Sequence, residues 1–310
     1  MRLVIIGAGF AGMYAAARLR DINGASPEEL EIALVAPEPA LVVRPRLYEP
    51  KPETLTAPLV DVLKAIDVVY VQGSAETVNT KSRMVEIFSA KGAKKNLSYD
   101  RLVSTIAPDM GAGPRLLIED ALNKLGVETR LGAGVAALDK SGVTLSDGER
   151  IEAETVIWAA GIRAAPLTAQ IPAERDNFGR LLVDRDLRVP GVAGVFATGD
   201  AARAACDDLG NYAPMSCQHA TRMGAFAGHN AAAELLGVPA KPYHQKAYVT
   251  CLDLGEAGAL FMRGWKRKVE MVGDVAKKTK QEINTVWIYR PRAERAAALA
   301  SADPERVTDL

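Results

Sequence analysis

The sequence predicts an α/β protein whose chain ends in a smaller α+β region. A short apolar run at residues 3–6 leads into a glycine-rich turn and then into an alanine-rich helix. Two later segments, residues 84–103 and 143–161, repeat the same order of a hairpin and an apolar strand. Continuous apolar runs are typical of buried parallel strands, so these features favour the α/β class. Residues 248–289 alternate apolar and polar side chains between glycine-rich turns, which predicts a small antiparallel sheet.

The composition restricts the partners and the compartment. The 310 residues include 38 Lys and Arg and 38 Asp and Glu, and this zero formal charge argues against nucleic acid as a partner. The three cysteines show no close pairing, so we expect no disulfide framework, no thiolate zinc site and a reducing, cytoplasmic compartment. The N-terminal segment imitates a signal peptide, but three glycines interrupt its apolar stretch, and we assign it to the fold.

The N-terminal glycines have separate mechanical roles in a dinucleotide-binding turn. The first permits a tight turn from strand to helix, the second lets a pyrophosphate approach the backbone, and the third lets helix and strand pack closely. The amides and the dipole of the helix N-terminus then hold the phosphate charge. A tight turn in an unrelated α/β protein is the alternative. The predicted binding residues are Gly7, Ala8, Gly9, Phe10, Ala11 and Gly12.

A second turn lies far downstream, where the predicted strand at residues 195–197 runs into Thr198-Gly199-Asp200. Together with the N-terminal glycines, it resembles the FAD-dependent pyridine nucleotide-disulfide oxidoreductase superfamily. The resemblance implies that Asp200, presented by Gly199, hydrogen-bonds the ribityl chain of FAD. A solvated turn aspartate is the alternative. The cysteine pair of the disulfide reductases in this superfamily has no counterpart near residues 39–48.

The repeated hairpin-and-strand units resemble the ends of two nucleotide domains, one for FAD and one for NAD(P)H. A complete βαβ unit needs about 30 residues or more, and none fits between the apolar run at residues 102–107 and the Pro-Gly segment at residues 108–114. We therefore expect a Rossmann-like FAD domain and a second nucleotide domain truncated at its front. The expected boundaries are residues 1–107 with 190–240 for FAD, 108–189 for the truncated NAD(P)H-type domain, and 241–310 for the C-terminal sheet region and tail.

A helix predicted from Cys217 onward, with Ser216 as its N-cap, is similar to a segment of type II NADH dehydrogenases. In that family the helix N-terminus faces the flavin, and the stretch AQxAxQ lies near the quinone. The resemblance thus implies cofactor contacts at Gln218 and His219, while Arg222 replaces the second glutamine. A packed or solvated histidine is the alternative for His219.

Two further contacts follow from the same resemblance. Arg44 and Arg46 lie in a segment that lines the flavin in related enzymes, and we expect one of them to meet the FAD diphosphate; a surface arginine pair is the alternative. Backbone groups near Ala75 are expected to bond the adenine.

The C-terminal region bears on membrane contact. The basic clusters at residues 266–268 and 277–280 suit anionic lipid, and a solvated turn with a lysine-protected edge strand accounts for them equally well. The tail from Arg292 to Leu310 shows no amphipathic anchor. We expect at most peripheral contact, at the inner face of the membrane, and a homo-oligomer remains open.

Two functions follow from these expectations. In the first, an FAD-dependent oxidoreductase passes electrons from NAD(P)H through the flavin to a quinone or another small acceptor. In the second, the chain is a flavin-binding remnant or shortened variant that no longer binds or oxidises NAD(P)H. No catalytic residue and no metal ligand is assigned.

Overall fold

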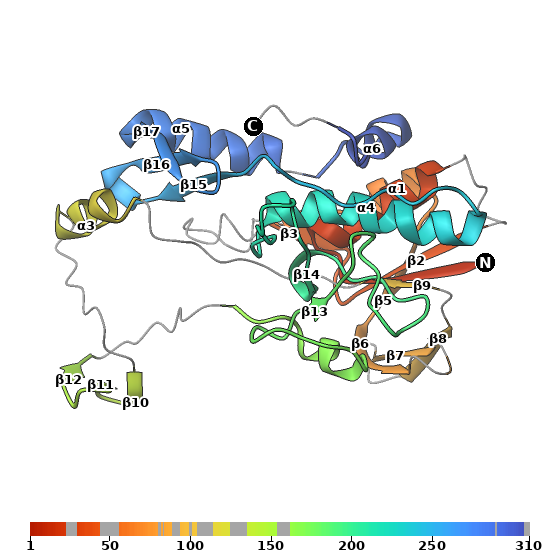
Figure 1. The fold of residues 1–310 in the computed structure, drawn as a ribbon, viewed down its shortest axis with the longest axis horizontal. Helices are drawn as coiled ribbons and strands as arrows, with labels where there is room; N and C mark the ends of the chain where they lie inside the picture. Colours follow the sequence, from red (N-terminus) through yellow and green to blue (C-terminus); the bar gives the residue numbers. More distant parts are fainter. Residues whose placement is uncertain are drawn as a thin grey trace.

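The computed structural model (Figure 1) places most of the chain in one layered body built around a parallel sheet. The structure describes residues 1–22, 30–43, 56–79, 82, 84–88, 94–98, 101–103, 114–124, 135–153, 162–288 and 290–306. Arg44, the Pro-Gly segment up to residue 113 and the predicted strands near residues 127–130 and 154–161 lie outside these ranges.

Four parallel strands form the central sheet in the order β5-β2-β1-β9. Strand β1 pairs with β2 from Arg2↔Glu31 to Ile6↔Val35, and its other edge pairs with β9. The side chains of Leu3, Val4 and Ile5 are fully buried, as the continuous apolar run predicts. This sheet confirms the α/β class. Its strands are β1 (Arg2–Ile6), β2 (Glu31–Ala36), β5 (Val69–Gln72) and β9 (Arg101–Val103).

Smaller elements form two separate sheets and a short helix beside the central sheet. Helix α2 (Val60–Ala65) precedes β5, and a short antiparallel ribbon joins β3 (Ala40–Val42) to β4 (Thr56–Pro58). The predicted first hairpin unit is present as a three-stranded antiparallel sheet of β6 (Ser74–Asn79), β7 (Met84–Phe88) and β8 (Lys94–Ser98).

Helices α1 (Phe10–Asp21) and α4 (Cys217–Leu236) pack against each other at backbone distance (Figure 1). A Cβ on Gly224 would lie 2.3 Å from the carbonyl oxygen of Ala11, and one on Gly228 would lie 2.6 Å from that of Ala15. Both contacts advance by four residues in the same direction, so the two helices run parallel and their N-termini lie at the same end. Glycine is therefore required at these two positions of α4.

Residues 162–189 share the core of the first domain. Ile171, Leu181 and Leu187 are buried in one cluster with Val4 and Val78. The 3₁₀ turn at Pro166–Gln170 docks on β6, where the Gln170 amide bonds Val78 N at 2.7 Å and Glu76 O at 2.6 Å. The expected boundary at residue 189 therefore does not coincide with a change of core.

Among the described residues, the predicted strand at residues 195–197 is present only as the bridge residues Val195 and Phe196, the second of which pairs with Arg188. Backbone hydrogen bonds run from Val189 N to Val195 O at 2.9 Å and from Ala197 N to Leu187 O at 3.1 Å. The segment is buried, with Val195, Phe196 and Ala197 each at most 3% exposed, in agreement with its apolar character. The short parallel pair of β13 (Leu181–Leu182) and β14 (Ala202–Arg203) lies nearby.

The second domain is expected at residues 108–189. Its described residues up to residue 153 form one helix and one small sheet. Helix α3 (Arg115–Lys124) agrees with the prediction, and Asp147-Gly148 turns the predicted hairpin. The sheet lies apart from the central sheet in Figure 1 and leaves Val135 and Leu138 about half exposed. Its strands are β10 (Val135–Asp139), β11 (Gly142–Leu145) and β12 (Arg150–Glu152).

The predicted C-terminal antiparallel sheet is confirmed, and helices follow it. Residues 266–267 lie in the turn between β16 and β17 and Lys268 begins the edge strand β17, as one alternative predicts, whereas residues 277–280 lie in helix α5. Residues 277–280 are helical because α5 packs one face against the sheet, where Ala276 is fully buried. The elements are β15 (Val249–Asp253), β16 (Ala259–Arg263), β17 (Lys268–Val272), α5 (Gly273–Glu282) and α6 (Arg295–Ser301).

The contact between α1 and α4 predicts the effect of one methyl group. Gly224→Ala improves helix propensity by up to about 1 kcal/mol, but its Cβ overlaps the Ala11 carbonyl. We expect a net loss of about 2 kcal/mol or more in the free energy of unfolding, measured by urea denaturation. Thr221→Ala on the same helix is the control and should change stability by less than about 0.5 kcal/mol. A Gly224→Ala protein as stable as the wild type contradicts the packing.

Candidate functional site

The glycine turn connects β1 to α1 with the geometry that its sequence predicts. Gly7 has a φ of +101° and donates its N–H to Val35 O at 2.8 Å, which ties the turn to the neighbouring strand. A Cβ on Gly12 would lie 1.9 Å from the Gly7 carbonyl oxygen. The first and third glycines are therefore required by backbone conformation and by close approach, respectively.

The N-terminus of α1 carries no competing negative charge. Gly9 is its N-cap, no side chain caps it, and its first turn contains no acidic residue. In a helix of 12 residues, the first amides and the dipole together favour an anion at this end. The turn thus has the local chemistry of a phosphate-binding site.

The second turn lies beside the first. Ile6, which ends β1, lines the same apolar cavity as Val195, Phe196 and Ala197, which lead into the second turn. Gly199 has a φ of +59°, and the carboxylate-bearing Asp200 is 3% exposed. Two loops almost 190 residues apart in the sequence therefore leave the core side by side.

The N-terminus of α4 completes this end of the molecule. Ser216 is its N-cap, as predicted, and its Oγ accepts a hydrogen bond from His219 N at 3.4 Å. Burial raises the pKa of the adjoining Cys217 thiol to about 11, the Lys280 charge opposes this shift, and the Asp200 carboxylate adds to it. Asp200 thus lies within electrostatic reach of the first residue of α4.

His219 is packed rather than solvated. Its ring is fully buried and lies 5.2 Å from the ring of Tyr248 and 5.9 Å from that of Trp265, between centroids. The Ser216 hydroxyl bonds its Nδ1 at 2.7 Å. Burial lowers the pKa of His219 to about 3, so the ring is neutral at physiological pH. Its Nε2 has no hydrogen-bond partner within the described part of the chain.

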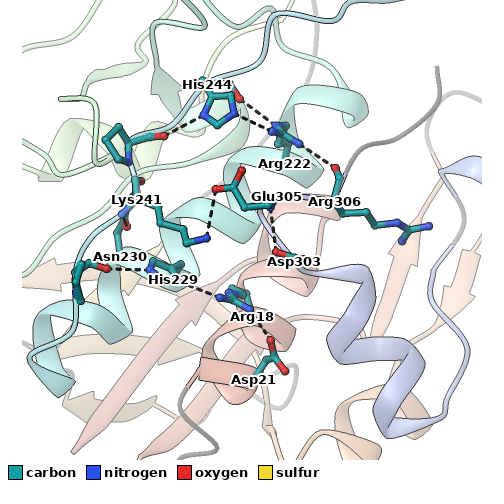
Figure 2. Close-up of polar contacts among 12 residues, drawn as sticks. Arg18, Asp21, Arg222, His229, Asn230, Lys241, His244, Asp303, Glu305 and Arg306 are labelled. Atoms are coloured by element: carbon teal, nitrogen blue, oxygen red, sulfur yellow. Dashed lines mark hydrogen bonds and ion pairs between the residues drawn. The ribbon is translucent and has the colours of Figure 1, made fainter.

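Gln218 and Arg222 use their polar groups within the protein. The Gln218 amide donates to Val249 O at 3.4 Å and accepts from Val249 N at 3.3 Å, which fastens α4 to β15. Figure 2 shows Arg222 between two segments: it donates to His244 O at 2.9 Å and to Arg306 O at 3.1 Å. The structure therefore brings the N-terminus of α4 to the site, but not the side chains of these two residues.

The other predicted contacts fall in different places. Ala75 lies on β6, paired with Ile87, and packs against the cluster that contains Val4. Arg44 lies outside the described residues. Sequence reasoning missed Thr198, whose hydroxyl is buried between the strand-like segment and Asp200 and has no partner among the described residues. The sequence signal that could have identified Thr198 is its hydroxyl side chain directly before the Gly-Asp pair.

The three cysteines in the described ranges lie in buried or half-buried positions. All three cysteines are free thiols there, and burial raises the pKa of Cys206 to about 12 and that of Cys251 to about 11. No group of three or more metal-ligating side chains occurs in that part of the chain. Among the same residues, no helix combines the length and the apolar character that a membrane span requires.

A cleft of about 460 Å³ lies toward the C-terminal ends of α1 and α4, away from the glycine turn. Its polar groups bond one another: Arg18 donates to Asp21 at 2.5 Å and to Nδ1 of His229 at 3.1 Å, and the ring's other nitrogen bonds Pro239 O (Figure 2). These contacts join α1 to α4 and to the loop after it. We therefore assign the candidate site to the end with the glycine turn.

Comparison with known proteins shows the family of the chain. Residues 100–224 match the family model described as "Pyridine nucleotide-disulphide oxidoreductase". An NADH dehydrogenase-like protein of Mycobacterium tuberculosis is 35% identical over 397 residues, covering 98% of each chain. Because 397 exceeds the 310 residues of this chain, the relative contains sequence that this chain lacks.

Two other similarities are more limited. A type II NADH:quinone oxidoreductase of M. tuberculosis is 39% identical over 105 residues, which is 31% of this chain and 23% of that protein. The structure of the sulfide:quinone oxidoreductase from Aquifex aeolicus superposes with a TM-score of 0.74 at 15% identity, covering 96% of this chain and 92% of that one. The second similarity shows the fold.

The buried His219 predicts a contribution to acid lability. Its pKa is depressed from 6.5 to about 3 in the folded state, so below pH 6.5 the unfolded chain binds a proton that the folded chain does not. The contribution of His219 to the free energy of unfolding is therefore fully present above pH 6.5. It declines as the pH falls below that value, by up to about 1.4 kcal/mol per pH unit. Comparing urea unfolding at pH 7 and pH 5, we expect His219→Phe to lose less stability on acidification than the wild type.

Thr221→Ala, on the same helix and without a titrating group, is the control. It should keep the wild-type difference between the two pH values. If His219→Phe and the wild type show equal losses, His219 is not the source of the acid dependence.

Proposed function

The chain belongs to the pyridine nucleotide-disulphide oxidoreductase superfamily, with similarity to type II NADH dehydrogenases, and from this premise we propose that it is an FAD-dependent NAD(P)H dehydrogenase. The single observation that carries the proposal is the convergence of the glycine turn, Asp200 and the N-terminus of α4 at one end of the molecule. No other end of the described structure combines a phosphate-binding turn with a buried acid.

The residues at this end fit FAD. The diphosphate needs an uncapped helix N-terminus and close backbone approach, and the turn from Gly7 to Gly12 provides both. The ribityl hydroxyls need buried polar partners, and Asp200 and the Thr198 hydroxyl offer them. We assign the diphosphate to the turn and the ribityl chain to these two residues.

Bound FAD supplies the hydride and electron transfer, and the chain supplies position and electrostatics. The N-terminus of α4, capped by Ser216, would place its positive dipole end at the flavin ring and stabilise negative charge there. The neutral His219 adds no charge behind this helix end. Ala75, on β6, and Arg44 are proposed contacts of the adenine and the diphosphate, respectively.

A quinone is the electron acceptor that we propose. The support comes from the type II NADH:quinone oxidoreductase that matches 31% of this chain and from the Cys217-Gln218-His219-Ala220 segment at the start of α4. Because the side chain of Gln218 is bound to Val249, the proposal places the acceptor at the helix end rather than on this amide.

A specific observation favours the alternative of a flavin-binding protein without NAD(P)H turnover. The NADH dehydrogenase-like relative aligns over more residues than this chain contains, so one or more internal segments are missing here. The sequence lacks a second GxGxxG turn between residues 103 and 114, where the second nucleotide domain would begin. The missing segment is therefore proposed to be the front of the NAD(P)H domain.

We propose a cytoplasmic protein that contacts the inner face of the membrane peripherally. Helix α5 and the turn after it expose Val275 by 61% and Val286 by 64%, and Lys278 is exposed on the same helix. Apolar side chains beside lysine suit the interface of an anionic bilayer. Because a water-soluble quinone can be reached without membrane contact, it can serve as the electron acceptor in an assay of the protein in solution.

Flavin binding should depend on the close approach at the glycine turn. We expect the wild type to purify with FAD and Gly12→Ala to lose most of it, because the added Cβ overlaps the Gly7 carbonyl and displaces the turn. Asp200→Asn should weaken FAD binding about tenfold or more through loss of a charge-assisted hydrogen bond. Flavin absorbance per protein and equilibrium dialysis measure both effects.

Asp139→Asn is the control, because Asp139 lies on the remote strand β10. It should leave flavin content unchanged. Full FAD occupancy in both Gly12→Ala and Asp200→Asn would refute the proposed site.

Electron transfer separates the two candidate functions. Under anaerobic conditions, NADH should bleach the flavin absorbance within seconds if the chain is a dehydrogenase, and a soluble quinone should then restore the absorbance. A yellow protein that stays oxidised with excess NADH, yet bleaches with dithionite, identifies the flavin-binding variant without NAD(P)H turnover. If NADPH bleaches the flavin absorbance as fast as NADH does, the protein does not distinguish the two electron donors.

A further inference from the structure

The C-terminal segment, residues 290–306, is bound to the helices that carry the proposed flavin site rather than to the sheet that precedes it. Ala298 and Ala302 are fully buried in the same cluster as Leu19 of α1. Arg295 forms an ion pair with Asp67 and donates to Ala65 O at 3.2 Å, which ties α6 to the end of α2. The segment therefore belongs to the core of the N-terminal domain.

Two contacts extend the segment from α1 to α4. Arg222, on the second turn of α4, donates to the carbonyl oxygen of Arg306 at 3.1 Å. Lys241, in the loop after α4, pairs with Glu305 at 3.3 Å (Figure 2). One stretch of chain thus contacts α1 and α2 through α6, and α4 through its last described residues.

Arg222 fastens three parts of the chain with one planar group. Its Nε donates to His244 O at 2.9 Å, its Nη1 to Arg306 O, and its Nη2 to Nε2 of His244 at 3.3 Å. A guanidinium has several donors in a fixed fork, which neither glutamine nor lysine can reproduce. The second glutamine of the AQxAxQ pattern is replaced here by a residue with a structural use.

The far end of the segment reaches toward the site. The Tyr14 ring, on the second turn of α1, is buried, and its hydroxyl is within electrostatic range of both Arg306 and Cys217. Cys217 is in turn within range of Asp200. The hydrogen bond from Arg222 to Arg306 O holds this end of the segment against the N-terminal half of α4.

We propose that residues 290–306 form a latch, anchored by Arg222, that fixes α1 against α4 and so retains the flavin. The flavin part of this inference rests on the proposed function; the latch itself rests on the contacts above. Arg222 is a positioning residue, because it acts on the cofactor through the segment that it holds.

The test compares full-length Arg222→Gln, Arg222→Lys and a control, Arg263→Gln, whose native arginine pairs with Glu270 on the C-terminal sheet. Hydrogen exchange of residues 295–306 and of α1 reports on the latch, and the rise of flavin fluorescence on dilution reports FAD dissociation. We expect about tenfold faster exchange and about tenfold faster dissociation in R222Q. R222K should recover part of both, since its ammonium can reach one carbonyl but cannot span two segments.

A variant that lacks residues 291–310 allows a double-mutant cycle with Arg222→Gln. In that background R222Q should have a smaller effect on FAD dissociation than in the full chain, because part of its action has been removed. If R222Q leaves exchange in residues 295–306 at the wild-type rate, the latch is refuted. If exchange rises while FAD dissociation stays unchanged, the link to the flavin is refuted.

Failure of the proposed function gives a different result. A protein that takes up no FAD would refute that function, while the exchange measurements would still decide whether the latch exists. If the shortened chain does not fold, the comparison of R222Q, R222K and R263Q in the full chain decides alone.

Discussion

The parallel contact between α1 and α4 is the constraint on which the rest of the structure depends. The backbones approach so closely that Gly224 and Gly228 have no room for a methyl group against Ala11 and Ala15. Because the helices run in the same direction, their N-termini lie at one end, where both dipoles present positive charge. Segments from opposite ends of the sequence thereby form one surface, and the Gly-Asp turn that packs on α4 adds a buried acid to it.

The same arrangement keeps the sheet and the two helices of the candidate site in one core, although the chain is shorter than its NADH dehydrogenase-like relative. The parallel sheet, α1, α4 and residues 162–206 share continuous buried clusters. The described part of residues 114–153 forms a helix and a small sheet with exposed apolar side chains, such as Leu138. None of these described residues belongs to the two buried clusters that hold the central sheet, α1 and α4 together.

Local patterns predicted the elements that depend on local physics. The turn from Gly7 to Gly12, the Ser216 cap and the Asp147-Gly148 hairpin each follow from a few adjacent residues. Long-range packing was not readable: residues 162–189 join the first core, which no local pattern indicates. The role of Arg222 depends on segments 22 and 84 residues away, so no local pattern marks it.

The most direct test of the central claim is a crystal structure of the protein purified with its flavin. The account predicts the diphosphate at the N-terminus of α1, the ribityl chain beside Asp200 and the flavin ring at the N-terminus of α4. A flavin bound anywhere else, or bound with the diphosphate away from the turn between Gly7 and Gly12, would contradict it.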